Sequence, residues 1–147
     1  MLNNKGFTLL EVLISVSILS VGLLSVAALQ TTALTGNTSA NHTTVGVQME
    51  EEMVDRIRLN AADTPNIYNN LDTRNCAALA DPALGDCIQW RDRLGINNSG
   101  LPNAFGTVTI QMDTPINKAT TVVVTLTWGS GATRSITFTT MLETWLA

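Results

Sequence analysis

An uninterrupted apolar segment, residues 7–29, most limits what this chain can fold into. Its 23 residues carry a single charge, that of Glu11. An α-helix rises about 1.5 Å per residue, so the segment would extend roughly 35 Å, enough to cross a bilayer core of about 30 Å. The segment therefore predicts a helix that crosses a membrane or lies in an apolar bundle of helices.

The charged residues are divided unevenly along the 147-residue chain. It has 8 Lys and Arg against 12 Asp and Glu, which gives a net charge of −4. Only Lys5 and Glu11 precede Glu50, and the other 18 charged residues lie from Glu50 onward. The acidic balance argues against a nucleic-acid-binding domain, so no nucleic-acid partner is predicted. The length fits one domain of ordinary size.

The short polar stretch before the apolar segment predicts its orientation. Lys5 favours a cytoplasmic N-terminus, with the C-terminal part across the membrane. A cleaved secretory signal is the alternative interpretation. The basic region is small for such a signal, however, and the apolar segment exceeds the usual core of about 7–15 residues. The residues Ala27, Ala28 and Leu29 also continue into helix-compatible sequence, where a signal peptidase site would need an Ala-x-Ala exit.

Glu11 lies four residues into the apolar segment, and a carboxylate in a membrane helix is costly unless it has a partner and a function. The surrounding sequence, KGFTLLEV from Lys5 to Val12, resembles the class III signal of type IV prepilins and type II secretion pseudopilins. The resemblance implies that a prepilin peptidase cuts between Gly6 and Phe7 and methylates the new amine of Phe7. Residues 1–6 would then be a leader peptide.

The same resemblance gives Glu11 a role in subunit assembly. In that family, this carboxylate neutralises the N-terminal amine of the next subunit, here the amine of Phe7. Each of these charges costs several kcal/mol in an apolar bundle unless it is paired, so the pair would set the register between subunits. The implied partners are the prepilin peptidase, the major pilin and other minor pilins, and inner-membrane lipid before assembly.

The helix is predicted to continue as an amphipathic half over residues 30–59, where no proline occurs. An apolar residue recurs every fourth position in the stripe formed by Val45, Met49, Met53 and Ile57. Residues 35–44 are rich in poor helix formers, so a bend or a frayed segment is an open possibility there.

The spacing of the charged residues in this half-helix predicts an ion pair and a solvated face. Glu52 and Arg56 stand four residues apart, in the order that favours an ion pair on a helix. The run from Glu50 to Glu52 is interpreted as a solvated helix face, with contact to a neighbouring subunit as the alternative.

Residues 60–147 are predicted to form a globular head, with a loop region and one short helix followed by an antiparallel sheet. Asp81 and Pro82 suggest the start of that helix, whose apolar residues are Leu84, Ile88, Trp90 and Leu94. Three segments alternate apolar and polar residues as strands do: residues 105–112, 120–128 and 135–142. Residues 129–133 would join the last two as a hairpin. A sheet with one apolar face needs a cover, which the helix stripe supplies.

This order of elements resembles the type IV pilin fold, an α+β fold in which one long N-terminal α-helix, transmembrane in its first half, packs on a small antiparallel β-sheet. The segments CIQWR, residues 87–91, and VTLTW, residues 124–128, resemble PilV-type minor pilins in particular.

Cys76 and Cys87 are the two cysteines of the chain. Both fall in the part placed outside the cytoplasm, where disulfides persist, so we expect them to be bridged. Buried free thiols and a metal site are the alternatives, the latter disfavoured because His42 is the only histidine.

Three functions fit these observations. The favoured one is a minor pilin that helps to initiate assembly and forms part of the tip of a type IV pilus, located first in the bacterial inner membrane and then in the extracellular filament. The alternative is a minor pseudopilin of a type II secretion system. A signal-anchored periplasmic binding protein is a third possibility, against which Glu11 argues. No catalytic constellation is visible, so neither enzymatic activity nor a cofactor is expected.

Overall fold

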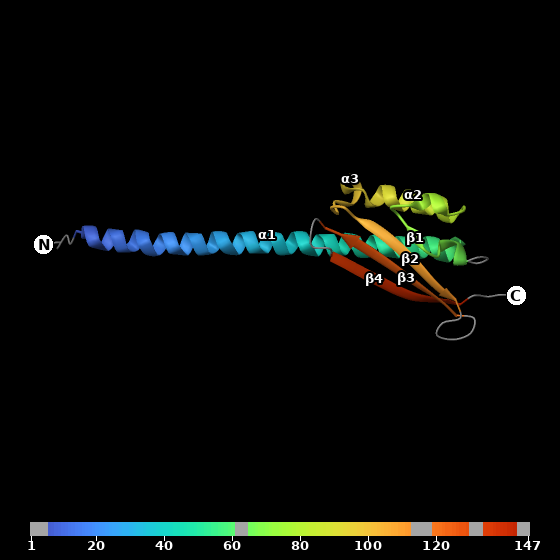
Figure 1. The fold of residues 1–147 in the computed structure, drawn as a ribbon. Helices are drawn as coiled ribbons and strands as arrows, with labels where there is room; N and C mark the ends of the chain where they lie inside the picture. The colour runs from blue at the N-terminus through green and yellow to red at the C-terminus, as the bar shows by residue number, and fades with distance from the viewer. Residues whose placement is uncertain (1–5, 61–64, 113–118, 130–133, 144–147) are drawn as a thin grey trace. The chain divides into compact units, whose positions relative to one another are not determined.

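The computed structural model describes residues 6–60, 65–112, 119–129 and 134–143. They fall into two units, residues 1–40 and 41–147. The helix α1 (Leu9–Asn60) contributes to both units. The second unit also holds the helices α2 (Ala83–Leu94) and α3 (Ile96–Ser99), two 3-10 turns (Pro65–Tyr68 and Cys76–Ala78), and four strands (Figure 1).

The helix α1 is 52 residues long, and its bounds lie within two residues of the expected ones. Residues 35–44 are helical throughout, so of the two possibilities left open there the frayed segment does not occur. The hydroxyls of Thr35 and Thr38 donate to the carbonyl oxygens of Thr31 and Leu34, both at 3.0 Å. These hydroxyls therefore bond to the helix itself and do not compete with it.

The strands form one antiparallel sheet in the order β1-β2-β3-β4. Their bounds are Leu71–Asp72, Phe105–Met112, Ala119–Trp128 and Arg134–Glu143, so the three predicted strands are confirmed. The two-residue β1 was missed because it is too short for alternation to show. Trp128 pairs with Arg134 on either side of the predicted hairpin turn, whose residues 130–133 lie outside the described residues.

One face of the sheet is apolar and carries the core of the head. Its buried side chains come from alternate positions of β2 and β3: Val108, Ile110, Val122, Val124, Leu126 and Trp128. From α1, Met53 and Ile57 of the predicted stripe are fully buried, whereas Val45 and Met49 are only partly buried. A Cβ on Gly46 would lie 2.8 Å from Cδ1 of Ile136, so the backbone of α1 lies close against the sheet at this glycine.

The helix α2 differs from its prediction at its start and in its buried face. It begins at Ala83, and neither Asp81 nor Pro82 caps it with a side-chain hydrogen bond. The buried residues are Ala83, Cys87, Trp90 and Leu94. This spacing of four, three and four residues follows the helix period, which places the predicted Leu84 and Ile88 at the margin.

Trp90 fixes the position of α2 on the sheet. Its indole Nε1 donates to the carbonyl oxygen of Met49 at 3.1 Å, and its ring lies against Gly106 of β2. A side chain on Gly106 would overlap this ring, so the absence of a Cβ there is what lets the indole reach the sheet.

Candidate processing and assembly site

The predicted cleavage position lies immediately before α1. Gly6 and Phe7 are exposed and precede the first helical residue, Leu9. Thr8 caps the helix, because its Oγ1 accepts a hydrogen bond from the Glu11 amide at 3.3 Å. The bond between Gly6 and Phe7 therefore lies in non-helical chain, the form in which a peptidase can bind it. Lys5 and the rest of the predicted leader lie outside the described residues.

Glu11 lies in the first turn of α1, where the unpaired amide groups of the helix favour a negative charge. Its side chain is exposed, and no ion pair with Glu11 occurs among the residues that the structure describes. The first unit thus presents a carboxylate without a counter-ion at one end of an apolar surface. Such a group needs a partner when that surface leaves water.

The apolar surface of α1 is continuous and unburied in its first unit. The exposed large side chains there are Leu9, Leu10, Val12, Leu13, Ile14, Val16, Ile18, Leu19, Val21, Leu23, Leu24, Val26, Leu29 and Leu34. By length and composition, α1 is the one helix of the described residues that could cross a membrane. An apolar surface of this extent needs lipid or other helices around it.

The serine and threonine hydroxyls along this surface all bond to the helix itself. Ser15, Ser17, Ser20 and Ser25 each donate to the carbonyl oxygen four residues earlier, at 2.7–2.9 Å. Thr31 and Thr32 do the same at 2.8 and 3.1 Å. These hydroxyls are therefore satisfied without any outside partner, unlike the carboxylate of Glu11.

The comparisons with known proteins concern this N-terminal segment. Residues 1–27 match the family model described as the prokaryotic N-terminal methylation motif. No curated protein and no solved structure gives a significant match to the chain.

The matched motif indicates the class III signal of type IV pilins, and the helix α1 that follows it is long and apolar enough to cross a membrane. The N-terminal helix packed on a four-stranded antiparallel sheet is the α+β type IV pilin fold. In its signal and its fold the chain is thus similar to type IV pilins and pseudopilins, structural proteins that prepilin peptidase processes and that assemble with other pilins.

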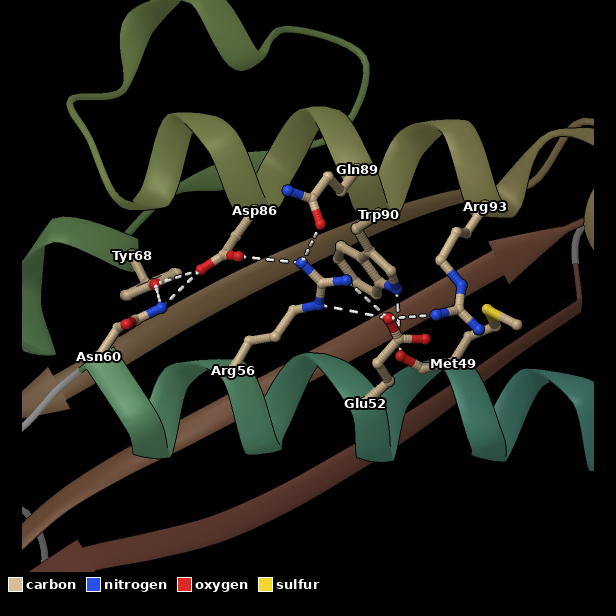
Figure 2. Close-up of polar contacts among 9 residues, drawn as sticks. All are labelled: Met49, Glu52, Arg56, Asn60, Tyr68, Asp86, Gln89, Trp90 and Arg93. Carbon is tan, nitrogen blue, oxygen red and sulfur yellow. Dashed lines mark hydrogen bonds and ion pairs between the residues drawn. The ribbon is translucent and has the colours of Figure 1, made fainter.

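A polar network joins α1 to α2 in the head (Figure 2). The predicted pair of Glu52 and Arg56 is confirmed at 2.8 Å. The structure adds three partners from α2 that the sequence did not reveal. Asp86 and Gln89 lie 3.0 and 2.9 Å from Arg56, and Arg93 lies 2.7 Å from Glu52. Acid and base thus alternate along a chain of ion pairs that begins and ends on α2 and passes through α1, and this chain holds the two helices in one register.

The network continues to the end of α1. The Tyr68 hydroxyl donates to Oδ2 of Asp86 at 2.5 Å, and the Asn60 amide donates to the same oxygen at 2.9 Å. Burial, together with the hydrogen bond to Asp86, raises the pKa of Tyr68 above its ordinary value. The tyrosine therefore stays neutral as a donor at physiological pH.

The interpretation of Glu50 to Glu52 as a solvated face is wrong for two of the three residues. Glu50 is 2% exposed and accepts a hydrogen bond from the Leu126 amide at 3.2 Å, and Glu52 is engaged in the network. Glu51 alone is exposed. Desolvation raises the pKa of Glu50 to about 7, against the lowering effect of the Leu126 hydrogen bond. The buried stripe of α1 runs through Gly46, Glu50, Met53, Val54 and Ile57.

The predicted disulfide between Cys76 and Cys87 is present in the structure. It joins the second 3-10 turn to α2, and both residues are buried. Among the described residues, no group of three His, Cys, Asp or Glu side chains is placed to hold a metal ion. The disulfide between Cys76 and Cys87 ties the loop region to α2, the helix that carries Trp90.

Proposed function

We propose that the protein is a minor pilin, a structural subunit that helps to initiate the assembly of a type IV pilus and forms part of its tip. The observation that carries the proposal is a class III signal directly followed by an apolar helix surface that is unburied. The two segments that resemble PilV-type minor pilins support the subtype, since their residues Cys87, Trp90 and Trp128 are core residues of the head.

In this proposal, the chain is used in four parts. Residues 1–6 are the leader, and cleavage after Gly6 exposes a methylated amine on Phe7. Residues 7–29 hold the subunit in the inner membrane and later in the filament core, residues 30–59 carry the head, and residues 60–147 complete the head outside the cytoplasm. No step requires the chain itself to catalyse a reaction.

Assembly in this proposal depends on a pair of charges between subunits. The exposed carboxylate of Glu11 neutralises the amine of Phe7 in the neighbouring subunit. Removing one member of a buried ion pair typically costs about 3–5 kcal/mol, which corresponds to a hundredfold or greater loss of incorporation.

The experiment compares wild-type protein with the Glu11→Leu variant in cells that make the filament. The mature N-terminus should be Phe7 in both, because cleavage depends chiefly on Gly6, and membrane insertion should be equal or easier without the charge. Sheared surface filaments should contain the wild type and be depleted of the variant. Leu10→Val, which keeps the charge, is the matched control.

Two results would contradict the proposal. A mature N-terminus near Gln30 would mean removal of the whole apolar segment as a secretory signal. Incorporation of Glu11→Leu at the wild-type ratio to the major subunit would contradict the charge pairing. The class III signal also serves minor pseudopilins of type II secretion. Cells that lack this protein and lose protein secretion while their surface pili stay intact would favour that function.

A further inference from the structure

We propose that the outer edge of β4 is a docking site for an extended strand of another protein, in which apolar side chains alternate and one basic side chain stands among them. The proposal concerns the head alone and does not rest on the proposed role in a filament. It follows from three features: an unpaired strand edge, the lack of the usual protection on that edge, and a hollow beside it.

The sheet pattern determines which backbone groups of β4 face outward. On the β1 side, the carbonyl oxygen of Gly106 accepts from the Thr73 amide at 3.0 Å, and the Gly106 amide donates to Thr73 Oγ1 at 2.9 Å. Gly106 is opposite Leu126, and Leu126 is opposite Ile136. Hydrogen-bonding direction alternates along antiparallel strands, so Ile136 bonds toward β3.

The odd-numbered residues of β4 accordingly direct their amide and carbonyl groups away from the sheet. In the fully described stretch these are Ser135, Thr137, Thr139 and Met141, whose side chains are exposed. No other described strand pairs with β4 on this side. Such a row of donors and acceptors is a template for strand addition.

The two edges of the sheet differ in length and in the residues that protect them. The β1 edge is two residues long, and the side chains of Thr73 and Asn69 bond to the β2 amides of Gly106 and Ile110 there. The β4 edge is ten residues long and contains neither proline nor lysine. Proteins usually protect an exposed edge with charges, proline or a bulge, and residues 135–142 carry no charge or proline.

A hollow of about 250 Å³ lies between α1 and this edge. It is lined by Val54 and Phe138 and by the charged residues Glu51, Asp55 and Arg58. Arg58 reaches across it, 3.3 Å from Asp55 and 3.2 Å from the Thr140 hydroxyl. An added strand places every second side chain on the α1 side of the sheet, so these side chains would enter the hollow beside Phe138.

The hollow selects the chemistry of the incoming strand. Phe138 offers apolar contact, with the almost wholly buried Val54 behind it, while Asp55 and Arg58 largely neutralise each other. Glu51 forms no ion pair within the described part of the chain. A strand with valine-like residues and one lysine or arginine at positions facing α1 would therefore fit both the apolar lining and the remaining negative charge.

The test uses full-length protein in detergent micelles and a fluorescent ten-residue peptide that alternates threonine with valine, with one lysine in place of a central valine. Binding is measured by fluorescence anisotropy. Amide hydrogen exchange on the same complex should show new protection at Thr137 and Thr139. A peptide with norleucine in place of lysine should bind the wild type less tightly than the lysine peptide does. The two peptides should bind the Glu51→Gln variant equally well.

Two changes, one in the protein and one in the peptide, should weaken strand addition without disturbing the head. Thr139→Pro removes an outward amide and leaves the bonds to β3 intact, since proline is tolerated on the open side of an edge strand. It should weaken binding at least about tenfold, because a hydrogen bond is lost and the ring obstructs the partner strand. Thr139→Val, which keeps the amide, is the matched control. A peptide methylated on every central backbone nitrogen, which blocks both of its edges, should fail to bind wild-type protein.

Three outcomes would overturn the proposal. The first is the absence of binding by the unmodified peptide. The second is equal binding of the N-methylated peptide or of the Thr139→Pro variant, which would mean contact elsewhere. The third is a dimer of the wild type by light scattering that Thr139→Pro dissociates, which would make a second copy of the chain the occupant.

Discussion

Glu50→Gln tests the energetic consequence of a carboxyl group buried under the sheet. The pKa of Glu50 is raised from 4.5 to about 7 in the folded protein, chiefly by desolvation. A raised folded-state pKa means that the native state holds the proton more tightly than the unfolded chain does. Stability from this group is therefore fully present below pH 4.5 and is lost as the pH rises to about 7.

The size of the effect follows from the pKa shift. At about 1.4 kcal/mol per pKa unit, the free energy of unfolding should fall by about 3 kcal/mol over that range. Glutamine keeps an oxygen for the Leu126 amide and carries no charge. The variant should match the wild type near pH 4.5 and exceed it by up to about 3 kcal/mol at pH 8.

Thermal unfolding of the full-length chain in mild detergent, followed by tryptophan fluorescence at pH 5 and pH 8, measures this difference. At pH 8 the variant should melt about 10 °C above the wild type, given the usual dependence of Tm on stability for a unit of this size. Glu51→Gln, which neutralises the exposed neighbour, should leave the profile unchanged. If Glu50→Gln loses stability between pH 5 and pH 8 as steeply as the wild type, another group titrates and the reasoning fails.

Three further changes test the packing of the head. Gly106→Ala should destabilise it by about 1–3 kcal/mol in denaturant unfolding, because the new methyl group overlaps the Trp90 ring; an unchanged midpoint would mean that the ring can move aside freely. Cys76→Ser should cost about 3 kcal/mol by opening the loop closed through Cys87, and reducing agent should then have no further effect on the midpoint, whereas it should destabilise the wild type. Arg56→Met should cost about 1–3 kcal/mol, because it leaves partly buried carboxylates without their cation; a change below about 0.5 kcal/mol in the same assay would place the arginine among ordinary surface ion pairs.

The features that sequence alone predicted are those with long, regular patterns. The apolar segment, the helix to Asn60 and the three alternating strands have periods that local physics determines, and the structure places them within one or two residues of expectation. The ion pair of Glu52 and Arg56 followed from helix spacing in the same way. The disulfide was predicted from the compartment and the even number of cysteines.

The features that sequence did not predict depend on contacts between distant residues. Asp86 and Arg93 meet the charges of α1 only after α2 has docked, across 30 and 41 positions of chain. Glu50 belongs to a run of three acids, whose composition alone does not distinguish the buried member from the exposed Glu51. A helical count through Gly46, Met53 and Ile57 would have placed Glu50 on the buried side.

Under the proposed function, the hydroxyls along the first unit of α1 bear on how easily the subunit would move from the membrane into a filament. Ser15, Ser17, Ser20 and Ser25 already donate to carbonyl oxygens of their own helix. A transfer from hydrocarbon chains to the side chains of other helices then requires no hydrogen bond of these residues to be broken or remade. Reversible extraction and return would depend on shape, van der Waals contact and the charge of Glu11, and the serines would add little barrier in either direction.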